Sequence, residues 1–451
     1  METDLKTVCA GMEMPAGVLE EFLRLFEKFK AGPALVDDWD SIHSPGEGVL
    51  ADYDQLALPG AEAAVRNLSR LVVLKLNGGL GTSMGCEGPK SCMVAKNGKT
   101  FLDLIFEQMR VLQERAVVPL VLMNSFYTHE ETARVIRELE KSVTVTTFQQ
   151  NRFPRLDTAT HLPAFPDPSQ EDAWYPPGHG DLFGCLRQQG LLDRWLQEGR
   201  EILFASNSDN LGAVVDERIL HLMLERDIPF LMELTPKTPV DVKGGTVYQR
   251  DGKLGLLEIG NVPDEFLDEF RGMNKFRVFN TNNIWIHLRH LKERLQQGPL
   301  DLGFVANQKV VRGRKVLQLE TAMGAGLGNF ENSLGLVVPR TRFAPVKNTS
   351  DLLRVRSDVY NESGGKLILN PERAITTLPE IILRGPLENA AELDRRVRVA
   401  PGMLGLDTLE VEGDVTFLGK VELKGRVKIV SNDGSLEIEG GQVLEDKVLS
   451  R

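Results

Sequence analysis

Residues 71–91 read LVVLKLNGGLGTSMGCEGPKS, an apolar stretch that runs directly into a glycine-rich loop. Leu71–Leu76 has the length and composition of a buried strand, broken only by Lys75. The glycines at 78, 79, 81, 85 and 88 let the main chain approach a ligand closely, and successive N–H groups in such a loop form an anion site. Lys90 adds a positive charge. Because ligands of open parallel sheets bind at the carboxyl ends of the strands, we expect an anionic ligand here.

Two familiar glycine loops do not match this stretch. The dinucleotide pattern GxGxxG fails because Met84 stands where the third glycine would follow Gly79 and Gly81. The P-loop pattern GxxxxGK[ST] fails because Pro89 separates Gly88 from Lys90. The loop is therefore neither a nicotinamide-dinucleotide site nor an ATPase loop by these criteria.

Strand-like and helical patterns alternate downstream of this loop. This alternation predicts an α/β domain with a mainly parallel sheet. The expected strands are 117–123, 143–148, 202–206 and 228–235, and the expected helices are 101–115, 128–140 and 215–226.

The two ends of the chain differ from this central part. Apolar residues at helical spacing predict an N-terminal helix over 17–30. Near the C-terminus, short apolar triplets at 415–417, 421–423 and 427–429 recur every six residues, each preceded by a glycine. This period favours a β-helix, and an antiparallel meander is the alternative. We expect an N-terminal helical segment (1–60), a catalytic domain (61–385) and a C-terminal β-helix (386–451), which stiffens the subunit or forms an interface.

The composition limits the classes of function. Lys and Arg number 53 against 64 Asp and Glu, so the formal net charge is −11. A chain this acidic is a poor candidate for binding nucleic acid or anionic membranes, and no apolar run approaches the roughly 18 residues of a membrane span. The four cysteines show no CxxC spacing, and the N-terminus has no secretory pattern. We expect a cytoplasmic protein with reduced thiols.

The stretch LKLNGGLGTSMGCEGPKS resembles the signature of the eukaryotic-type UTP–glucose-1-phosphate uridylyltransferases. The resemblance continues from about residue 60 to near the end of the chain, through TFLDL, VPLVLMNSF, AWYPPGHGD, DNLGA, DVKGGT, FNTNN, LETAMGA, FENSLG, APVKNTSDLL and GDVTF. It implies a nucleotidyltransferase fold, which is a Rossmann-like, mostly parallel mixed sheet flanked by helices with a C-terminal β-helix. It also implies that UTP and glucose 1-phosphate react to give UDP-glucose and pyrophosphate.

That reaction determines which residues to seek. The sugar phosphate has a second pKa of about 6, so it is largely dianionic at neutral pH and needs no strong general base. The difficulty lies in bringing two polyanions together, which positioning, cations and Mg²⁺ achieve. The resemblance implies that Lys90 and Lys347 contact the reacting phosphates. Lys347 precedes an expected helix capped by Thr349 or Ser350. Asp209 follows the expected strand 202–206 at the same sheet edge as the glycine loop, where a carboxylate can hold Mg²⁺.

The remaining site residues follow from the resemblance alone. It implies that Gln150 and Gly178 contact uracil and that His179 lies near the sugar phosphate. The expected nucleotide contacts also include Leu76, Asn77, Gly78 and Gly79, and the expected sugar-phosphate contacts also include Asn207, Asn280, Asn282 and Glu320. Asn and Glu are also ordinary turn and surface residues, so Asn280, Asn282 and Glu320 rest on the resemblance most heavily.

Two alternatives stay open at this point. The sugar substrate could be galactose 1-phosphate or N-acetylglucosamine 1-phosphate, because the choice depends on the shape of the pocket. The chain could also be a non-catalytic UDP-sugar-binding scaffold. Self-association through the C-terminal β-helix is a further expectation from the resemblance.

Overall fold

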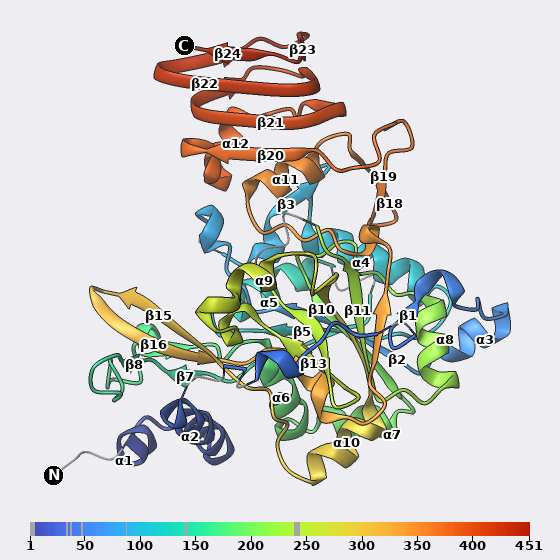
Figure 1. Cartoon of the computed structure of the whole chain (residues 1–451), viewed down its shortest axis with the longest axis vertical. Helices are drawn as coiled ribbons and strands as arrows, with labels where there is room; N and C mark the ends of the chain where they lie inside the picture. Colours follow the sequence, from blue (N-terminus) through green and yellow to red (C-terminus); the bar gives the residue numbers. More distant parts are fainter. Residues whose placement is uncertain are drawn as a thin grey trace.

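The computed structural model describes residues 5–32, 35–36, 38–46, 48–86, 88–139, 143–238 and 244–451 of the chain (Figure 1). A large body holds the central sheet, and a stack of long strands rises from it toward the C-terminus. Glu87, Glu140 and residues 241–243 of the DVKGGT motif lie outside the described residues. Within those ranges, none of the helices combines the length and apolarity that a membrane span requires.

The body is built on an eight-stranded sheet in the order β1-β17-β11-β14-β10-β2-β5-β6. Every neighbouring pair is parallel except the two that involve β14, which runs antiparallel between β11 and β10. The mostly parallel mixed sheet predicted from the sequence is confirmed. The strands are β1 (Ala51–Asp52), β2 (Leu71–Asn77), β5 (Leu120–Asn124), β6 (Val145–Gln149), β10 (Ile202–Asn207), β11 (Phe230–Pro236), β14 (Val278–His287) and β17 (Leu334–Val337).

Helices cover both faces of this sheet, because alternate residues of the buried strands point to opposite sides. Val73 and Phe204 pack with α4 (Phe101–Gln113) and α8 (Glu217–Glu225) on one face. Val72 and Leu203 pack on the other face with a second set of helices. That set comprises α6 (Leu182–Gln188), α7 (Leu191–Gln197) and α10 (Leu288–Gln296). A further helix, α5 (His129–Leu139), follows β5 in the chain.

The strand register aligns the carboxyl ends of the central strands. Asn207 at the end of β10 pairs with Leu76 of β2, and Asn77 of β2 pairs with Asn124 of β5. Asn124 in turn pairs with Gln149 at the end of β6. The loops that leave these strands therefore meet at one edge of the sheet.

The C-terminal strands are all parallel neighbours. β20 (Glu380–Arg384), β21 (Gly402–Phe417), β22 (Glu422–Ile438), β23 (Val443–Glu445) and β24 (Val448–Ser450) form one sheet. The antiparallel meander weighed as an alternative is wrong. The first and last residues of each triplet point inward, and Val415, Leu423 and Ile429 are among the buried ones. β20 lies before residue 386 yet pairs with β21, so pairing of this sheet starts earlier in the chain than the glycine period does.

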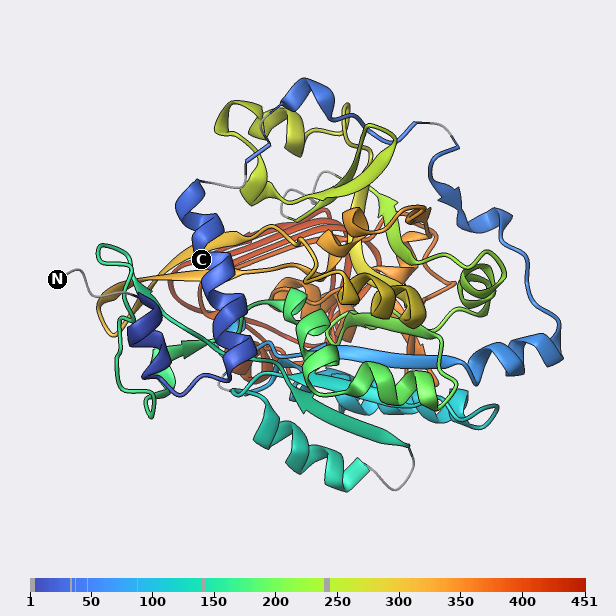
Figure 2. The same ribbon diagram turned by 90° about the horizontal axis from the view of Figure 1, so that it is seen from below.

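The N-terminal part of the chain contacts the body in several places. The expected helix 17–30 is α2 (Ala16–Ala31), whose Phe22 and Phe26 pack against Phe153, Tyr175 and Leu319. Figure 2 shows α1 and α2 beside the long hairpin of β15 (Val305–Val311) and β16 (Arg314–Glu320), which β8 (Leu156–Asp157) extends. β1 then joins the main sheet beside β17.

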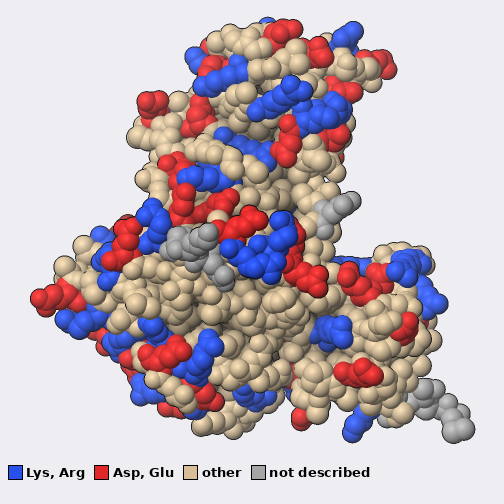
Figure 3. All heavy atoms as spheres, turned by 180° about the vertical axis from the view of Figure 1, so that it is seen from behind, with Lys and Arg blue, Asp and Glu red and all other residues tan. Residues whose placement is uncertain are grey.

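Shorter elements complete the fold. They are α1 (Leu5–Ala10), α3 (Ala61–Leu68), β3 (Val94–Lys96), β4 (Lys99–Thr100), β7 (Phe153–Pro154), β9 (Trp174–Tyr175), β12 (Thr246–Arg250), β13 (Lys253–Leu257), α9 (Leu267–Arg271), α11 (Thr349–Arg356), β18 (Tyr360–Ser363), β19 (Lys366–Leu369) and α12 (Ala390–Arg396). On the face seen in Figure 3, Lys and Arg side chains are interspersed with Asp and Glu. An anionic substrate must therefore be held by local groups rather than by an extended basic surface.

Candidate active site

The glycine-rich loop after β2 folds back on itself. Leu80 and Pro89 form an antiparallel bridge, and the Gly81 N–H donates to the carbonyl of Gly88 over 3.3 Å. The Lys90 N–H donates to the carbonyl of Gly79 over 3.2 Å. This closure returns Lys90 to the sheet edge from which the loop departs.

Lys90 and Asp209 meet at that edge. The Lys90 ammonium lies 2.5 Å from Oδ2 of Asp209, and the two side chains are only 15% and 18% exposed. The Ser208 N–H donates to the Leu76 carbonyl over 3.1 Å, which fixes the loop after β10 against the end of β2. Oδ1 of Asp209 is buried and has no hydrogen-bond partner among the described residues. One carboxylate oxygen therefore remains available to a further ligand.

Lys347 reaches the same edge from the segment between β17 and α11. The Val346 N–H donates to the Asp209 carbonyl over 3.2 Å, and Pro345 forms an antiparallel bridge with Asn210. The exposed Lys347 ammonium lies 5.6 Å from the ring centroids of both Phe279 and Phe343. The main chain around Lys347 is thus tied to Asp209, while its charged end stays accessible.

The helix after Lys347 begins differently from the expectation. The cap of α11 is Asn348, whose Oδ1 accepts from the Asp351 N–H over 2.9 Å, so the prediction of Thr349 or Ser350 is wrong. Asp351 Oδ2 accepts in return from the Lys347 N–H over 2.9 Å. Asn was overlooked as a cap although it is among the strongest capping residues.

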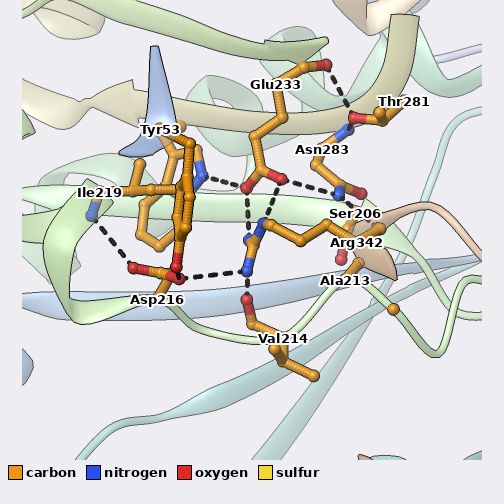
Figure 4. A network of polar contacts seen from close by, with 12 residues as sticks. Tyr53, Ser206, Ala213, Val214, Asp216, Ile219, Glu233, Thr281, Asn283 and Arg342 are labelled. Carbon is orange, nitrogen blue, oxygen red and sulfur yellow. Dashed lines mark hydrogen bonds and ion pairs between the residues drawn. The ribbon is translucent and has the colours of Figure 1, made fainter. Parts of the chain in front are cut away.

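A buried ion pair lies beneath the site, and it holds the Asp209 loop and the segment that leads to Lys347 together (Figure 4). Arg342 donates from Nε and Nη2 to the two carboxylate oxygens of Glu233, over 2.7 and 2.6 Å, and the Glu233 side chain is fully buried. Burial opposes the charge on Arg342, but Glu233 outweighs that effect and raises the pKa of the guanidinium. The Arg342 carbonyl accepts from the side-chain amides of Asn210 and Asn283 over 3.3 and 3.2 Å. The pair therefore anchors both the Asp209 loop and the segment that leads to Lys347.

Sequence analysis missed this pair, because the two residues lie 109 positions apart. One signal was available: Glu233 is the only charge within the apolar run IPFLMELT of residues 228–235. A carboxylate inside a buried strand needs a cationic partner, although the sequence does not say which.

Lys75 is a second buried cation near the site. Its ammonium donates to Ser206 Oγ over 2.8 Å and to the Ala213 carbonyl over 2.7 Å. Burial, with a smaller contribution from Arg342, lowers the pKa of Lys75 to about 7. The Lys75 side chain therefore links the end of β2 to the end of β10, and the β10 strand ends shortly before Asp209.

The residues expected to contact uracil also lie together. A Cβ on Gly78 would stand 2.3 Å from Nε2 of Gln150, so these two residues are in direct contact. Oε1 of Gln150 is buried without a partner among the described residues. Gly178 has a φ of +85°, and a Cβ there would lie 2.5 Å from the Thr321 carbonyl oxygen. Asp181 joins these loops, because its Oδ2 accepts from the Asn151 N–H over 2.6 Å.

His179 is held as a neutral ring with a defined tautomer. Its Nδ1 accepts from the Met323 N–H over 2.9 Å, which leaves the ring proton on Nε2. Burial lowers the pKa of His179 to about 4. At neutral pH the ring can therefore donate one hydrogen bond without carrying a charge.

Three of the expected sugar contacts, Asn207, Asn280 and Asn282, meet at Asn282. Asn282 has a φ of +57°, and its Nδ2 donates to Asn207 Oδ1 over 2.9 Å. Its N–H donates to Asn280 Oδ1 over 2.8 Å, and its own Oδ1 is buried without a partner among the described residues. Glu320 lies against Gly178 and borders a cavity of about 360 Å³ that also contacts Glu258 and Ala322.

Asn77 and Leu76 do not present their side chains to the site. Asn77 is buried and donates from Nδ2 to Asn124 Oδ1 over 2.8 Å and to Thr132 Oγ1 over 3.0 Å. The Leu76 side chain packs in the apolar core, and its carbonyl accepts from Ser208. Both residues shape the strand end from which the glycine loop departs.

The chain is similar to known proteins over most of its length. A sequence profile of the family described as UTP--glucose-1-phosphate uridylyltransferase matches residues 19–424. The UTP--glucose-1-phosphate uridylyltransferase of Hordeum vulgare is 46% identical and the match covers 94% of this chain and 92% of that protein. The Solanum tuberosum protein of the same name is 44% identical, with 98% and 95% covered.

Solved structures match over the whole chain. The crystal structure of UDP-glucose phosphorylase from Trypanosoma brucei has a TM-score of 0.88 at 36% identity and covers 100% of both chains. A mutant UDP-glucose pyrophosphorylase from Leishmania major, in complex with UDP-glucose, has a TM-score of 0.88 at 32% identity, again with 100% of both chains covered. The resemblance seen in the sequence is thereby confirmed, and the chain belongs to the UTP–glucose-1-phosphate uridylyltransferase family.

Proposed function

We propose that this chain transfers the uridylyl group of UTP to glucose 1-phosphate, reversibly giving UDP-glucose and pyrophosphate. A phosphate oxygen of the sugar phosphate bonds to the α-phosphorus of UTP, and the bond from that phosphorus to the bridging oxygen of pyrophosphate breaks. The observation that carries the proposal is the meeting of Lys90, Asp209 and the Lys347 segment at one sheet edge. Two lysines and a carboxylate with a free oxygen suit a reaction between polyanions.

The two lysines supply positive charge where negative charge accumulates. Lys90, at the end of the glycine loop, would bind the phosphates of UTP together with the loop N–H groups. Lys347, whose ammonium is accessible, would bind the phosphates at the reacting centre. Holding both substrates in line converts an encounter of two anions into a step between positioned groups.

The donor set fits Mg²⁺ as the cofactor. Asp209 Oδ1 is a buried carboxylate oxygen without a hydrogen-bond donor, and Mg²⁺ typically takes one or two carboxylates together with water and substrate phosphate. Asp209 would hold the ion, and the bound ion would supply charge neutralisation at the phosphates. Lys90, now on Oδ2 of the same carboxylate, would then turn toward the phosphates.

The other groups account for binding of the base and the sugar phosphate. The unpaired Gln150 Oε1 and the strained main chain at Gly178 would contact uracil, with Gly78 and Gly79 lying against the nucleotide. Nε2–H of His179 would donate to the sugar phosphate without adding charge. Asn207, Asn280, Asn282 and Glu320 would contact the sugar phosphate and the glucose hydroxyls.

The C-terminal parallel strands are best described as a β-helix, which we place outside the catalytic centre. Val443 and Val448 on its last strands are 56% and 69% exposed, so this end offers an apolar edge for self-association. We also propose that the chain has three parts, with boundaries at about residues 60 and 385, and that the protein is cytoplasmic.

Pyrophosphate release from UTP, glucose 1-phosphate and Mg²⁺ tests the proposal. We expect turnover that EDTA abolishes and that falls sharply when ATP replaces UTP. A preference for N-acetylglucosamine 1-phosphate or galactose 1-phosphate would reassign the sugar. Folded protein that binds UDP-glucose without turnover would favour the non-catalytic scaffold.

A further inference from the structure

A cluster of metal-ligating side chains lies far from the catalytic edge. Asp227 follows α8, His287 ends β14, and His290 lies in the first turn of α10. One ligand atom from each of the three lies within 4.8 Å of the others, and no other such trio occurs in the part of the chain that the structure describes. His287 pairs with Ile202, the first residue of β10, whereas Asn207 at the far end of β10 reaches the active site. At about 3.3 Å per residue, the two sites are roughly 16 Å apart along the strand.

The spacing of the three ligand atoms is close to that of a tetrahedral metal site. Nε2 of His287 lies 3.2 Å and Nε2 of His290 3.1 Å from Oδ1 of Asp227. Ligands at roughly 2.0–2.2 Å from a tetrahedral zinc ion stand about 3.3–3.5 Å apart. Two of the three distances between ligand atoms are thus already close to those of a zinc site. Only a movement of the partly exposed His290 is needed to shorten the third distance, between the two histidines.

His287 has no polar side-chain partner outside the cluster in the part of the chain that the structure describes. His287 is 97% buried, its Nδ1 has no partner among the described residues, and its only polar side-chain contact lies inside the cluster. Nε2 of His290 is buried without a hydrogen bond of acceptable geometry. His287 is also the N-terminal cap residue of α10, yet its side chain makes no cap hydrogen bond. Burying an imidazole nitrogen without a hydrogen-bond partner costs free energy unless a ligand binds the ring.

The charged groups around the cluster bear on whether it can hold a cation. Arg289 donates to both oxygens of Asp227 over 2.8 and 2.9 Å, and Glu293 lies 3.8 Å from Nδ1 of His290. Such outer partners orient ligating carboxylates and histidines in metal sites. The exposed Arg289 opposes a cation, and the carboxylates of Asp227 and Glu293 outweigh its charge, whereas Glu201 is already paired with Arg70.

We propose that Asp227, His287 and His290 bind one divalent transition-metal ion of the zinc type, with water at the fourth position. Two imidazoles and a carboxylate suit zinc rather than Mg²⁺, which prefers oxygen ligands. The bound ion links the end of α8 to the start of α10. It therefore stabilises the body without entering the reaction, and this site stands independently of the proposed function.

Calorimetric titration of the full-length, metal-free chain with Zn²⁺ tests this site. The titration uses an Asp209→Asn background, so that the catalytic carboxylate does not contribute. We expect one Zn²⁺ per chain, at least tenfold weaker binding in His290→Gln and Asp227→Asn, and unchanged binding in His43→Gln, an exposed histidine elsewhere. Zn²⁺ should also raise the unfolding temperature of the parent and not that of His290→Gln.

Two results would overturn the proposal. One is the absence of Zn²⁺ binding, and the other is equal binding by the parent and His290→Gln. The buried His287 is left unchanged, because its replacement would perturb folding directly. With Asp209 intact and Mg²⁺ present, His290→Gln should turn over UTP like the wild type, so failure of this site and failure of the proposed function are distinguishable.

Discussion

The ammonium of Lys90 lies 2.5 Å from Oδ2 of Asp209, although the two residues are 119 positions apart in the chain. They meet because β2 and β10 are parallel neighbours whose carboxyl ends are in register. Lys90 neutralises the carboxylate on one oxygen and leaves Oδ1 free. The two residues therefore act as a unit, and their separate contributions to catalysis should not add.

Lys90→Ala should lower kcat about 10²- to 10³-fold, because a cation positioned at the reacting phosphates is lost. Circular dichroism and thermal unfolding should show an intact fold. Lys253→Ala is the matched control, since Lys253 pairs with Glu331 at the surface and should keep full activity. An unfolded Lys90→Ala variant would mean that this lysine is structural.

Asp209→Asn should raise the Mg²⁺ concentration for half-maximal activity at least tenfold, because a neutral amide is a poor ligand for Mg²⁺. A Mg²⁺ titration of initial rate measures this directly. Asp433→Asn, a change of the same type in the C-terminal sheet, should leave the titration unchanged. A wild-type titration curve for Asp209→Asn would reject the metal role.

Gly178→Ala should raise KM for UTP by tenfold or more. The new methyl group would lie 2.5 Å from the Thr321 carbonyl oxygen, so the loop must move. Gly199→Ala isolates the backbone strain, because Gly199 has a similar φ of +76° with nothing within 4 Å of the methyl position. Gly199→Ala should lose roughly 1 kcal/mol of stability from backbone strain, Gly178→Ala should lose more because of the added clash, and only Gly178→Ala should lose affinity for UTP. Equal KM values would argue against a nucleotide contact at Gly178.

Glu233→Gln should destabilise the fold by about 3 kcal/mol, because Arg342 loses its bidentate partner and keeps Asp216, whose Oδ2 lies 3.5 Å from Nη1. Any folded variant should also need more Mg²⁺, since the pair anchors the Asp209 loop and the Lys347 segment. Glu331→Gln, which breaks an exposed pair with Lys253, should change stability by less than about 1 kcal/mol. Chemical unfolding compares the two, and similar losses would contradict the role of the buried pair.

Acid should destabilise the protein in part through His179. Its pKa of about 4 in the folded state lies below the ordinary value near 6.5, so the unfolded chain binds a proton more readily between these values. Stability is therefore unaffected above about pH 6.5 and is lost as pH falls toward 4, by up to about 2 kcal/mol at pH 5. Urea unfolding at pH 7 and 5 should show a smaller loss for His179→Gln than for wild type. An identical loss would mean that His179 titrates normally.

Much of the site was predictable because it depends on strand ends. Two apolar runs, 71–76 and 202–206, each lead directly into a loop with charged or polar residues. In a parallel sheet such loops share one edge, so the approach of Lys90 and Asp209 follows from the pattern. The six-residue period at the C-terminus favoured a β-helix over an antiparallel meander, and the strands there are parallel neighbours.

Other features depend on contacts that no local pattern encodes. The antiparallel β14 enters the middle of the sheet, and Glu233 contacts Arg342 only once β11 and β17 are paired. The motif residue Asn77 turns its side chain inward to Asn124 and Thr132, because the end of β2 is buried on both faces. The sequence motif therefore locates the segments that form a site, whereas tertiary packing determines which of their side chains face the ligand.

The fate of the α-phosphorus of UTP tests the central claim most directly. Wild-type protein with glucose 1-phosphate and Mg²⁺ would receive UTP radiolabelled at either the α- or the γ-phosphorus. The α-label should appear in UDP-glucose and the γ-label in pyrophosphate, and Lys90→Ala should slow both transfers about 10²- to 10³-fold. Folded wild-type protein that transfers neither label, or that places the γ-label in a sugar product, would contradict uridylyl transfer at this site.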